Sequence, residues 1–108
     1  MGNEETWSMA EVLAGLNMLN HIDSTRGVPG DNYTTRLIAI LLVAQGSNLS
    51  NLLFTNREYE RPLHIMTASG QDADVMEEVV NAKIEELPMK ERAMIEVLVE
   101  LSKDKVPS

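Results

Sequence analysis

Residues 37–44, with the sequence LIAILLVA, form the longest uninterrupted apolar stretch of this chain. Asp31 and Asn32 are favourable residues for starting a helix, and Gly46 is typical of the position just after one ends. The sequence therefore predicts a helix over 32–45, although the periodicity of so short a run also allows a strand. Because such a helix is apolar on every side, we expect it at the centre of the domain or of an oligomer.

The chain of 108 residues contains no cysteine. This length forms a single domain that can bury a core without disulfides. The absence of cysteine excludes thiolate metal sites and fits a reducing compartment. The first residues lack the features of a signal peptide, and the longest apolar run is far shorter than the ~20 residues that span a bilayer. We expect a soluble cytoplasmic protein that does not bind membranes.

Acidic residues outnumber basic ones by 17 to 9, which gives a net charge of -8. Nucleic-acid binding depends on Lys and Arg displacing counterions from phosphates, and only four aromatic residues are present for base stacking. Direct nucleic-acid binding is therefore not expected. An acidic surface favours a basic protein partner instead, and it can compete with nucleic acid for that partner.

A helix over 8–22 has the clearest start signal. Ser8 and Glu11 have the spacing of a capping box, while Trp7 and Val12 have that of a hydrophobic staple. Gly15 in the middle of this helix indicates a close approach of another helix. The apolar stripe consists of Val12, Leu13, Leu16, Leu19 and Ile22.

Two more helices are predicted at 72–87 and 88–103, separated by Pro88, which ends one helix and suits the first turn of the next. The first is capped by Ser69 or Asp72 and faces inward with Val75, Met76, Val79, Val80, Ile84 and Leu87. The second has an unusually wide apolar arc, so we expect it to be central or to form a subunit interface.

Residues 47–70 have the weakest pattern. Ser47 to Ser50 can start a short helix, and Leu63 to Thr67 alternates loosely, as a short extended segment would. We predict an irregular or short-helical segment here.

The acidic residues and the histidines are the candidates for a metal or ligand site. Asp74, Glu77 and Glu78 lie within one helical turn and can hold Mg²⁺, but Glu77 and Glu78 face away from the apolar stripe, which favours a solvated surface. No catalytic, cofactor-binding or metal site is assigned. An alternative pocket for an anionic ligand combines His21, Asp23, Arg57, Arg61 and His64.

Residues 84–95 resemble the opening helix of sigma-factor region 4, in which a Leu-Pro step leads into a helix that begins with Glu-Arg. Leu87-Pro88 and Glu91-Arg92 carry the resemblance, which covers about a ninth of the chain. It implies a transcription component. In that family a helix-turn-helix follows, whereas this sequence ends soon after Lys105. We interpret the similarity as a shared way of starting a helix.

The sequence thus predicts an all-α domain over 1–108, with four main helices at 8–22, 32–45, 72–87 and 88–103, and frayed ends at 1–7 and 104–108. Since two helices have more apolar surface than a small domain hides, a homodimer is expected. Its predicted interface consists of Leu41, Leu42, Met89, Met94, Leu98 and Leu101.

The predicted function is that of a small acidic regulator or adaptor that binds another protein and can inhibit a nucleic-acid-binding partner. The alternative is a small all-α enzyme or ligand-binding protein that uses Mg²⁺ or an anionic ligand. A converging set of charged residues would favour the enzyme or ligand-binding protein, whereas an exposed apolar patch would favour the adaptor.

Overall fold

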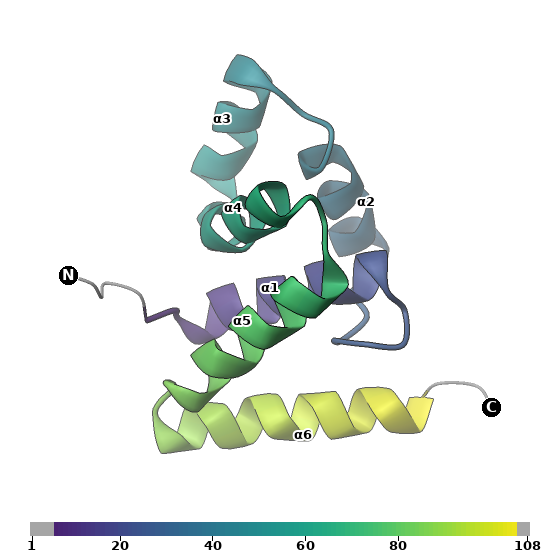
Figure 1. Ribbon diagram of the computed structural model, residues 1–108, viewed down its shortest axis with the longest axis vertical. Helices are drawn as coiled ribbons and strands as arrows, with labels where there is room; N and C mark the ends of the chain where they lie inside the picture. The colour runs from purple at the N-terminus through teal and green to yellow at the C-terminus, as the bar shows by residue number, and fades with distance from the viewer. Residues whose placement is uncertain (1–5, 106–108) are drawn as a thin grey trace.

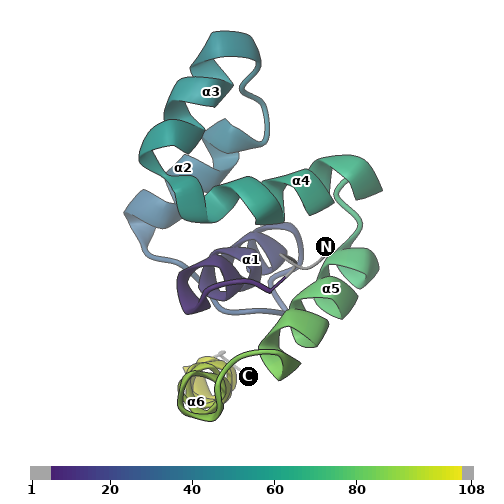
Figure 2. The same cartoon turned by 90° about the vertical axis from the view of Figure 1, so that its left-hand side faces the viewer.

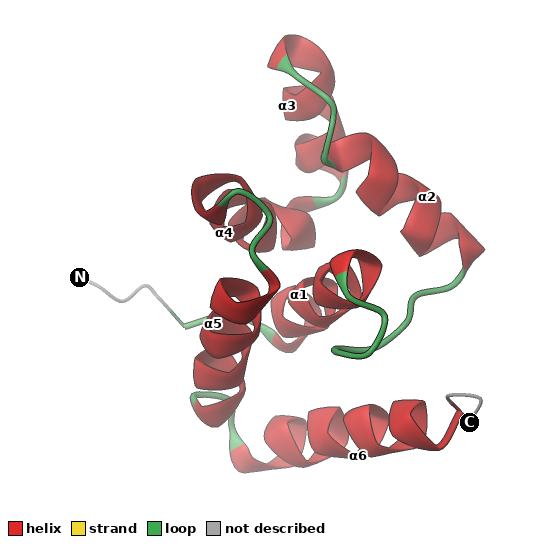
Figure 3. Ribbon diagram, turned by 45° about the vertical axis from the view of Figure 1, so that its right-hand side comes forward, coloured by secondary structure: helices red, strands yellow, loops and turns green. Residues whose placement is uncertain are grey.

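The computed structural model describes residues 6–105, and this part of the chain is all-helical, as predicted (Figure 3). Turns and short loops join the helices, and no strand occurs within these residues. The ends at 1–5 and 106–108, where fraying is predicted, lie outside the described residues. The elements are α1 (Met9–Ile22), α2 (Asn32–Leu41), α3 (Gly46–Thr55), the 3₁₀ turn η2 (Arg57–Tyr59), α4 (Glu60–Ser69), α5 (Ala73–Glu85) and α6 (Met89–Lys105).

The central element of the fold is α1. It packs against α2, η2, α4, α5 and α6, and Figure 2 shows it enclosed between α4 on one side and α6 on the other. Six of its residues are buried: Val12, Ala14, Gly15, Leu16, Met18 and Leu19. The 37–44 run therefore does not form the centre of the domain, and its predicted place at the centre of an oligomer stays a prediction. The amphipathic helix α1, which begins with a capping box, occupies the centre of the domain instead.

The start of α1 confirms the local signals of the sequence. The Ser8 hydroxyl accepts a hydrogen bond from the Glu11 backbone N–H at 3.1 Å, and the Glu11 carboxylate accepts one from the Ser8 backbone N–H at 2.8 Å. Trp7 is buried, although the sequence places it in a frayed end. Gly15 permits the expected close approach, because a Cβ at this position would lie 3.0 Å from Val80 Cγ2 on α5.

The second helix is shorter than predicted and has only one buried face. Asp31 caps it, since its carboxylate accepts a hydrogen bond from the Thr34 backbone N–H at 2.8 Å. The helix ends at Leu41, four residues before the expected end, and Gly46 begins α3 instead of closing α2. Ile40 and Val43 are exposed. An unbroken apolar run is therefore divided here between the core and the surface.

Residues 46–69 form the two short helices α3 and α4 with η2 between them, which confirms the short-helical alternative predicted for 47–70 over the irregular one. The extended segment expected at Leu63–Thr67 is helical, because Leu63 and Met66 lie one turn apart on the buried face of α4. Pro62 is the third residue of α4, where the missing N–H is not needed for the helix. Gly70, with φ of 67°, ends α4 in the left-handed conformation.

Hydrogen bonds attach the loop between α1 and α2 to α1, and three of them involve Arg26 and Val28 on either side of Gly27. The Val28 backbone N–H donates to the Leu16 carbonyl at 3.2 Å. The Asn17 and Asn20 side-chain amides donate to the Val28 and Arg26 carbonyls, both at 2.8 Å. Leu16, Asn17 and Asn20 of α1 therefore hold the middle of the loop.

The helix α6 lies along the edge of the molecule (Figure 1) and contacts α1 and α5. Asp72 caps α5, as one of the two expected cap residues, and Pro88 precedes α6. Within residues 6–105 no helix combines the length and the apolar character that crossing a membrane requires.

Candidate binding sites

Two apolar stripes follow the length of α6, and only one of them is buried. Ile95 is 1% exposed, and Val99 packs partly against the core. A second stripe at the spacing i, i+3, i+4, i+7 consists of Met94, Val97, Leu98 and Leu101, with exposed fractions of 56%, 57%, 39% and 49%. We call these four residues the outer stripe of α6. The outer stripe is part of the wide apolar arc that the sequence predicts for this helix. Such an arc needs to be covered by other elements, and these four side chains are exposed.

A shallow hollow lies on this surface. It has a volume of about 370 Å³ and is lined by Ala93, Met94, Val97 and Leu98. Four of the predicted interface residues, Met89, Met94, Leu98 and Leu101, are exposed on α6. The other two lie at the end of α2, on the far side of α1 (Figure 1): Leu41 is the last residue of the helix and is 2% exposed, and Leu42 follows the helix and is half-buried. Leu41 is therefore part of the core of the single chain.

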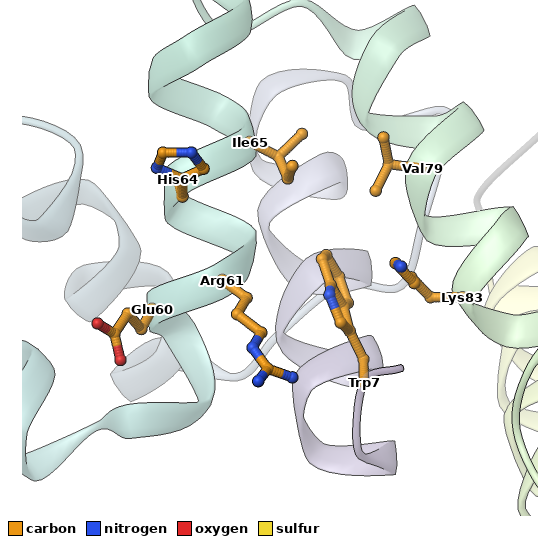
Figure 4. Close-up of a pocket in the computed structure, with 7 residues that line it drawn as sticks. All are labelled: Trp7, Glu60, Arg61, His64, Ile65, Val79 and Lys83. Carbon is orange, nitrogen blue, oxygen red and sulfur yellow. The ribbon is translucent and has the colours of Figure 1, made fainter. Parts of the chain in front are cut away.

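A second candidate site is a cleft of about 580 Å³ between α4 and α5, next to the start of α1. Figure 4 shows Trp7 between the two helices, with Arg61 and His64 on the α4 side and Lys83 on the α5 side. Ile65 and Val79 complete the apolar part of the wall, and Glu60 lies at the rim. We call this site the Trp7 cleft.

The residues of the predicted anion pocket are only partly brought together. Arg61 and His64 line the Trp7 cleft one turn apart. His21 and Asp23 lie at the opposite end of α1, and Arg57 in η2 does not line the cleft. Asp23 is engaged elsewhere, because its two carboxylate oxygens bind Thr25 at 2.6 Å and Arg26 at 3.0 Å.

The acidic residues of α5 have a cationic partner within the protein. The Arg26 guanidinium contacts Asp74 at 2.7 Å and Glu77 at 3.1 Å, which joins the loop after α1 to α5. The hydrogen bond to Asp74 raises the pKa of Arg26 further above its ordinary value, and the Thr25 hydroxyl and backbone N–H lower the pKa of Asp23. Among residues 6–105 no three potential ligands converge as a metal site would require.

Trp7 and Lys83 were missed as site residues because they come from elements far apart in the sequence. Trp7 carries the pattern of a hydrophobic staple, which explains its burial but not its place in a cleft. Lys83 has the appearance of an ordinary surface lysine in the sequence, yet its side chain is only 14% exposed. Comparison with protein families, curated proteins and solved structures finds no match for this chain.

Proposed function

We propose that this protein is a regulator or adaptor that acts by binding a basic amphipathic helix of another protein on the outer stripe of α6. The observation that carries the proposal is the spacing and exposure of Met94, Val97, Leu98 and Leu101. Residues at i, i+3, i+4 and i+7 are the anchors by which helices recognise apolar partners. Contiguous exposed apolar side chains mark interaction sites more often than isolated ones do.

Charge determines which partner fits the stripe. The exposed Glu96 and Glu100 lie on α6 beside it, Glu100 is 3.6 Å from Lys103 of the same helix, and the chain as a whole has a net charge of -8. A helix with a leucine-rich stripe and lysine or arginine edges is attracted by this field, whereas a second copy of the chain is repelled by it. The basic partner is therefore favoured over the homodimer, which stays a prediction for the same stripe.

This proposal also supports an inhibitory role. A basic helix that binds nucleic acid would lose its access to phosphates while it lies on the acidic surface of this protein. The cysteine-free composition fits action in the cytoplasm, which is a reducing compartment.

The test uses a synthetic peptide with leucine at i, i+3, i+4 and i+7 and lysine at the other positions. A counterpart with the same leucines and glutamate in place of lysine measures the contribution of charge. Binding of each labelled peptide is followed by fluorescence anisotropy at low and at physiological salt. We expect saturable binding of the lysine peptide that weakens as salt screens the charges, and no binding of the glutamate peptide.

Val97→Asp removes the apolar contact, and Val43→Asp is its matched control. Val97 and Val43 are 57% and 77% exposed, on α6 and just after α2. Both substitutions add one negative charge, so pure electrostatic attraction would strengthen binding in both. We expect Val97→Asp to weaken binding at least ~10-fold, as for a residue at the centre of an interface, and Val43→Asp to leave it unchanged.

The proposal would be overturned by a failure of the binding tests or by self-association through the stripe. The first is the absence of saturable binding by the lysine peptide, or equal binding by both Val→Asp variants. The second is a stable dimer of the chain alone in sedimentation analysis that Val97→Asp dissociates, because a second copy would then occupy the stripe.

A further inference from the structure

The Trp7 cleft is a separate site from α6, and its walls combine apolar surface with the cationic side chains of Arg61 and Lys83. Its volume of about 580 Å³ lies within the range of pockets for small molecules. We propose that the cleft binds a small organic carboxylate, with the apolar body of the ligand on Trp7, Ile65 and Val79 and the carboxylate near Lys83 and Arg61.

Lys83 is the first reason. Its side chain is 14% exposed, and its Nζ lies 6.0 Å from the centroid of the Trp7 ring. Within the part of the chain that the structure describes, the nearest paired carboxylate is that of Glu86, 3.7 Å away, whereas a charge-assisted N–H···O bond measures ~2.7–2.9 Å. The stem of the lysine is largely covered, while its ammonium lines the cleft and, among the described residues, has only this long ion pair. A carboxylate in the cleft would supply a closer acceptor.

Arg61 is the second reason. Its Nη1 donates a hydrogen bond to the Thr6 carbonyl at 2.9 Å and lies 3.5 Å from the Glu11 carboxylate. Both contacts use the same nitrogen atom of a guanidinium that has five N–H donors. The contact with Thr6 holds the side chain beside Trp7, and the other nitrogen atoms can bind a carboxylate in the planar geometry that arginine favours.

The floor of the cleft is preorganised. Trp7 is 7% exposed, and the α-carbon of Gly15 lies so close that an added Cβ would be 3.2 Å from Trp7 Cζ3. The ring therefore has little freedom to move toward α1. Figure 4 shows the Glu60 carboxylate directed away from Trp7, so the acidic residue at the rim does not face the carboxylate of a ligand. An aliphatic or aromatic body can pack on the indole without displacing any element.

The test uses the fluorescence of Trp7, which is the single tryptophan of the chain. Hexanoate is the probe, hexanamide is its neutral counterpart of the same shape, and acetate is an anion without an apolar body. We expect a saturable emission change with hexanoate, with a Kd on the order of 1 mM, and none with acetate or hexanamide in the same range. An equal response to hexanamide, or no response to hexanoate, would overturn the proposal.

Matched variants separate a specific site from general attraction. Lys83→Met and Arg61→Gln each remove one cation from the cleft and should weaken hexanoate binding roughly 10-fold or more. Lys103→Met and Arg57→Gln remove the same charges elsewhere and should have no effect. Far-UV circular dichroism confirms that each variant is folded, and the two cleft variants test the proposal independently. If both bind hexanoate as the unmodified chain does, the assignment is wrong.

The inference does not rest on the proposed function of α6, and the same variants keep the two apart. Val97→Asp should bind hexanoate normally while it loses the basic peptide. Lys83→Met should bind the peptide normally. Loss of hexanoate binding in Val97→Asp would place the probe on the outer stripe and contradict a site at Trp7.

Discussion

Gly27→Ala should lower the free energy of unfolding much more than Gly46→Ala does. Both glycines have positive φ, +70° at Gly27 and +61° at Gly46, so an alanine is strained at either position. Their surroundings differ. A Cβ at Gly27 would lie 2.3 Å from the Leu16 carbonyl oxygen of α1, whereas a Cβ at Gly46 would meet nothing within 4 Å. Both substitutions include the cost of the left-handed backbone conformation. The difference between them therefore measures the contribution of packing the loop on α1.

The magnitudes follow from these contacts. A left-handed alanine costs about 1–2 kcal/mol, and the stiffer unfolded chain offsets about 0.4–1 kcal/mol of it. Gly46→Ala should therefore lower the free energy of unfolding by about 1 kcal/mol. At Gly27 the clash is with backbone, which no rotamer change relieves, so the loop must move away from α1. The three hydrogen bonds on either side of Gly27, each worth about 0.5–1.5 kcal/mol, are then weakened or lost.

We therefore expect Gly27→Ala to cost about 2–4 kcal/mol more than Gly46→Ala. Urea unfolding followed by Trp7 fluorescence and by far-UV circular dichroism measures both values, and coincident transitions verify two-state behaviour. The reasoning would be refuted by a difference below ~0.5 kcal/mol between the two variants, because the loop would then not be packed on α1 as the structure shows.

Two further predictions concern the packing of the core and the stability of the protein at low pH. Met18→Ala, at a fully buried position of α1, should lower the free energy of unfolding by about 2–5 kcal/mol, whereas Met89→Ala, at a position 78% exposed, should change it by less than ~0.5 kcal/mol. Similar losses in urea titrations would contradict the central place of α1. The Thr34 N–H lowers the pKa of Asp31 below its ordinary value of 3.8, so the stabilisation by the ionised cap is present above that value and is lost as the pH falls through the lower pKa of the folded state. Asparagine caps a helix without ionising, so Asp31→Asn should show a weaker loss of stability below pH ~4 in the same titrations, and parallel pH profiles would contradict this role.

The parts of the fold that depend on local rules were predictable from the sequence. Ser8 and Glu11 define the start of α1 because a capping box involves only neighbouring backbone groups. Asp72 marks the start of α5 and Pro88 separates α5 from α6, again through local backbone groups. The all-α class follows from such signals together with the apolar periodicity of the last two helices.

The centre of the fold was not predictable, because burial is a property of the tertiary arrangement. The run at 37–44 is more apolar than α1, yet Ile40 and Val43 are exposed while α1 contacts nearly every other element. Pro62 does not interrupt α4, because a proline in the first turn leaves a helix intact. The spacing of Leu63 and Met66 was the signal that could have identified α4.

The candidate sites were likewise predictable only where they depend on a local sequence pattern. The wide apolar arc of α6 was visible in the sequence, and the exposure of Met94 and Leu98 agrees with it. Arg61 and His64 lie together because 60–69 is helical, whereas the sequence predicts an extended segment over Leu63–Thr67. Trp7 and Lys83 join them only because α1 and α5 cross at Gly15, and no local pattern contains that information.

The claim that the outer stripe of α6 binds a basic helix is tested most directly by the methyl resonances of the methionines. Met94 lies in the stripe and is 56% exposed, whereas Met18, Met66 and Met76 are fully buried and serve as internal references. With the lysine peptide at saturation, the account predicts a large shift of the Met94 methyl signal and unchanged signals from the three buried residues. An unchanged Met94 signal, or shifts confined to the other methionines, would contradict it.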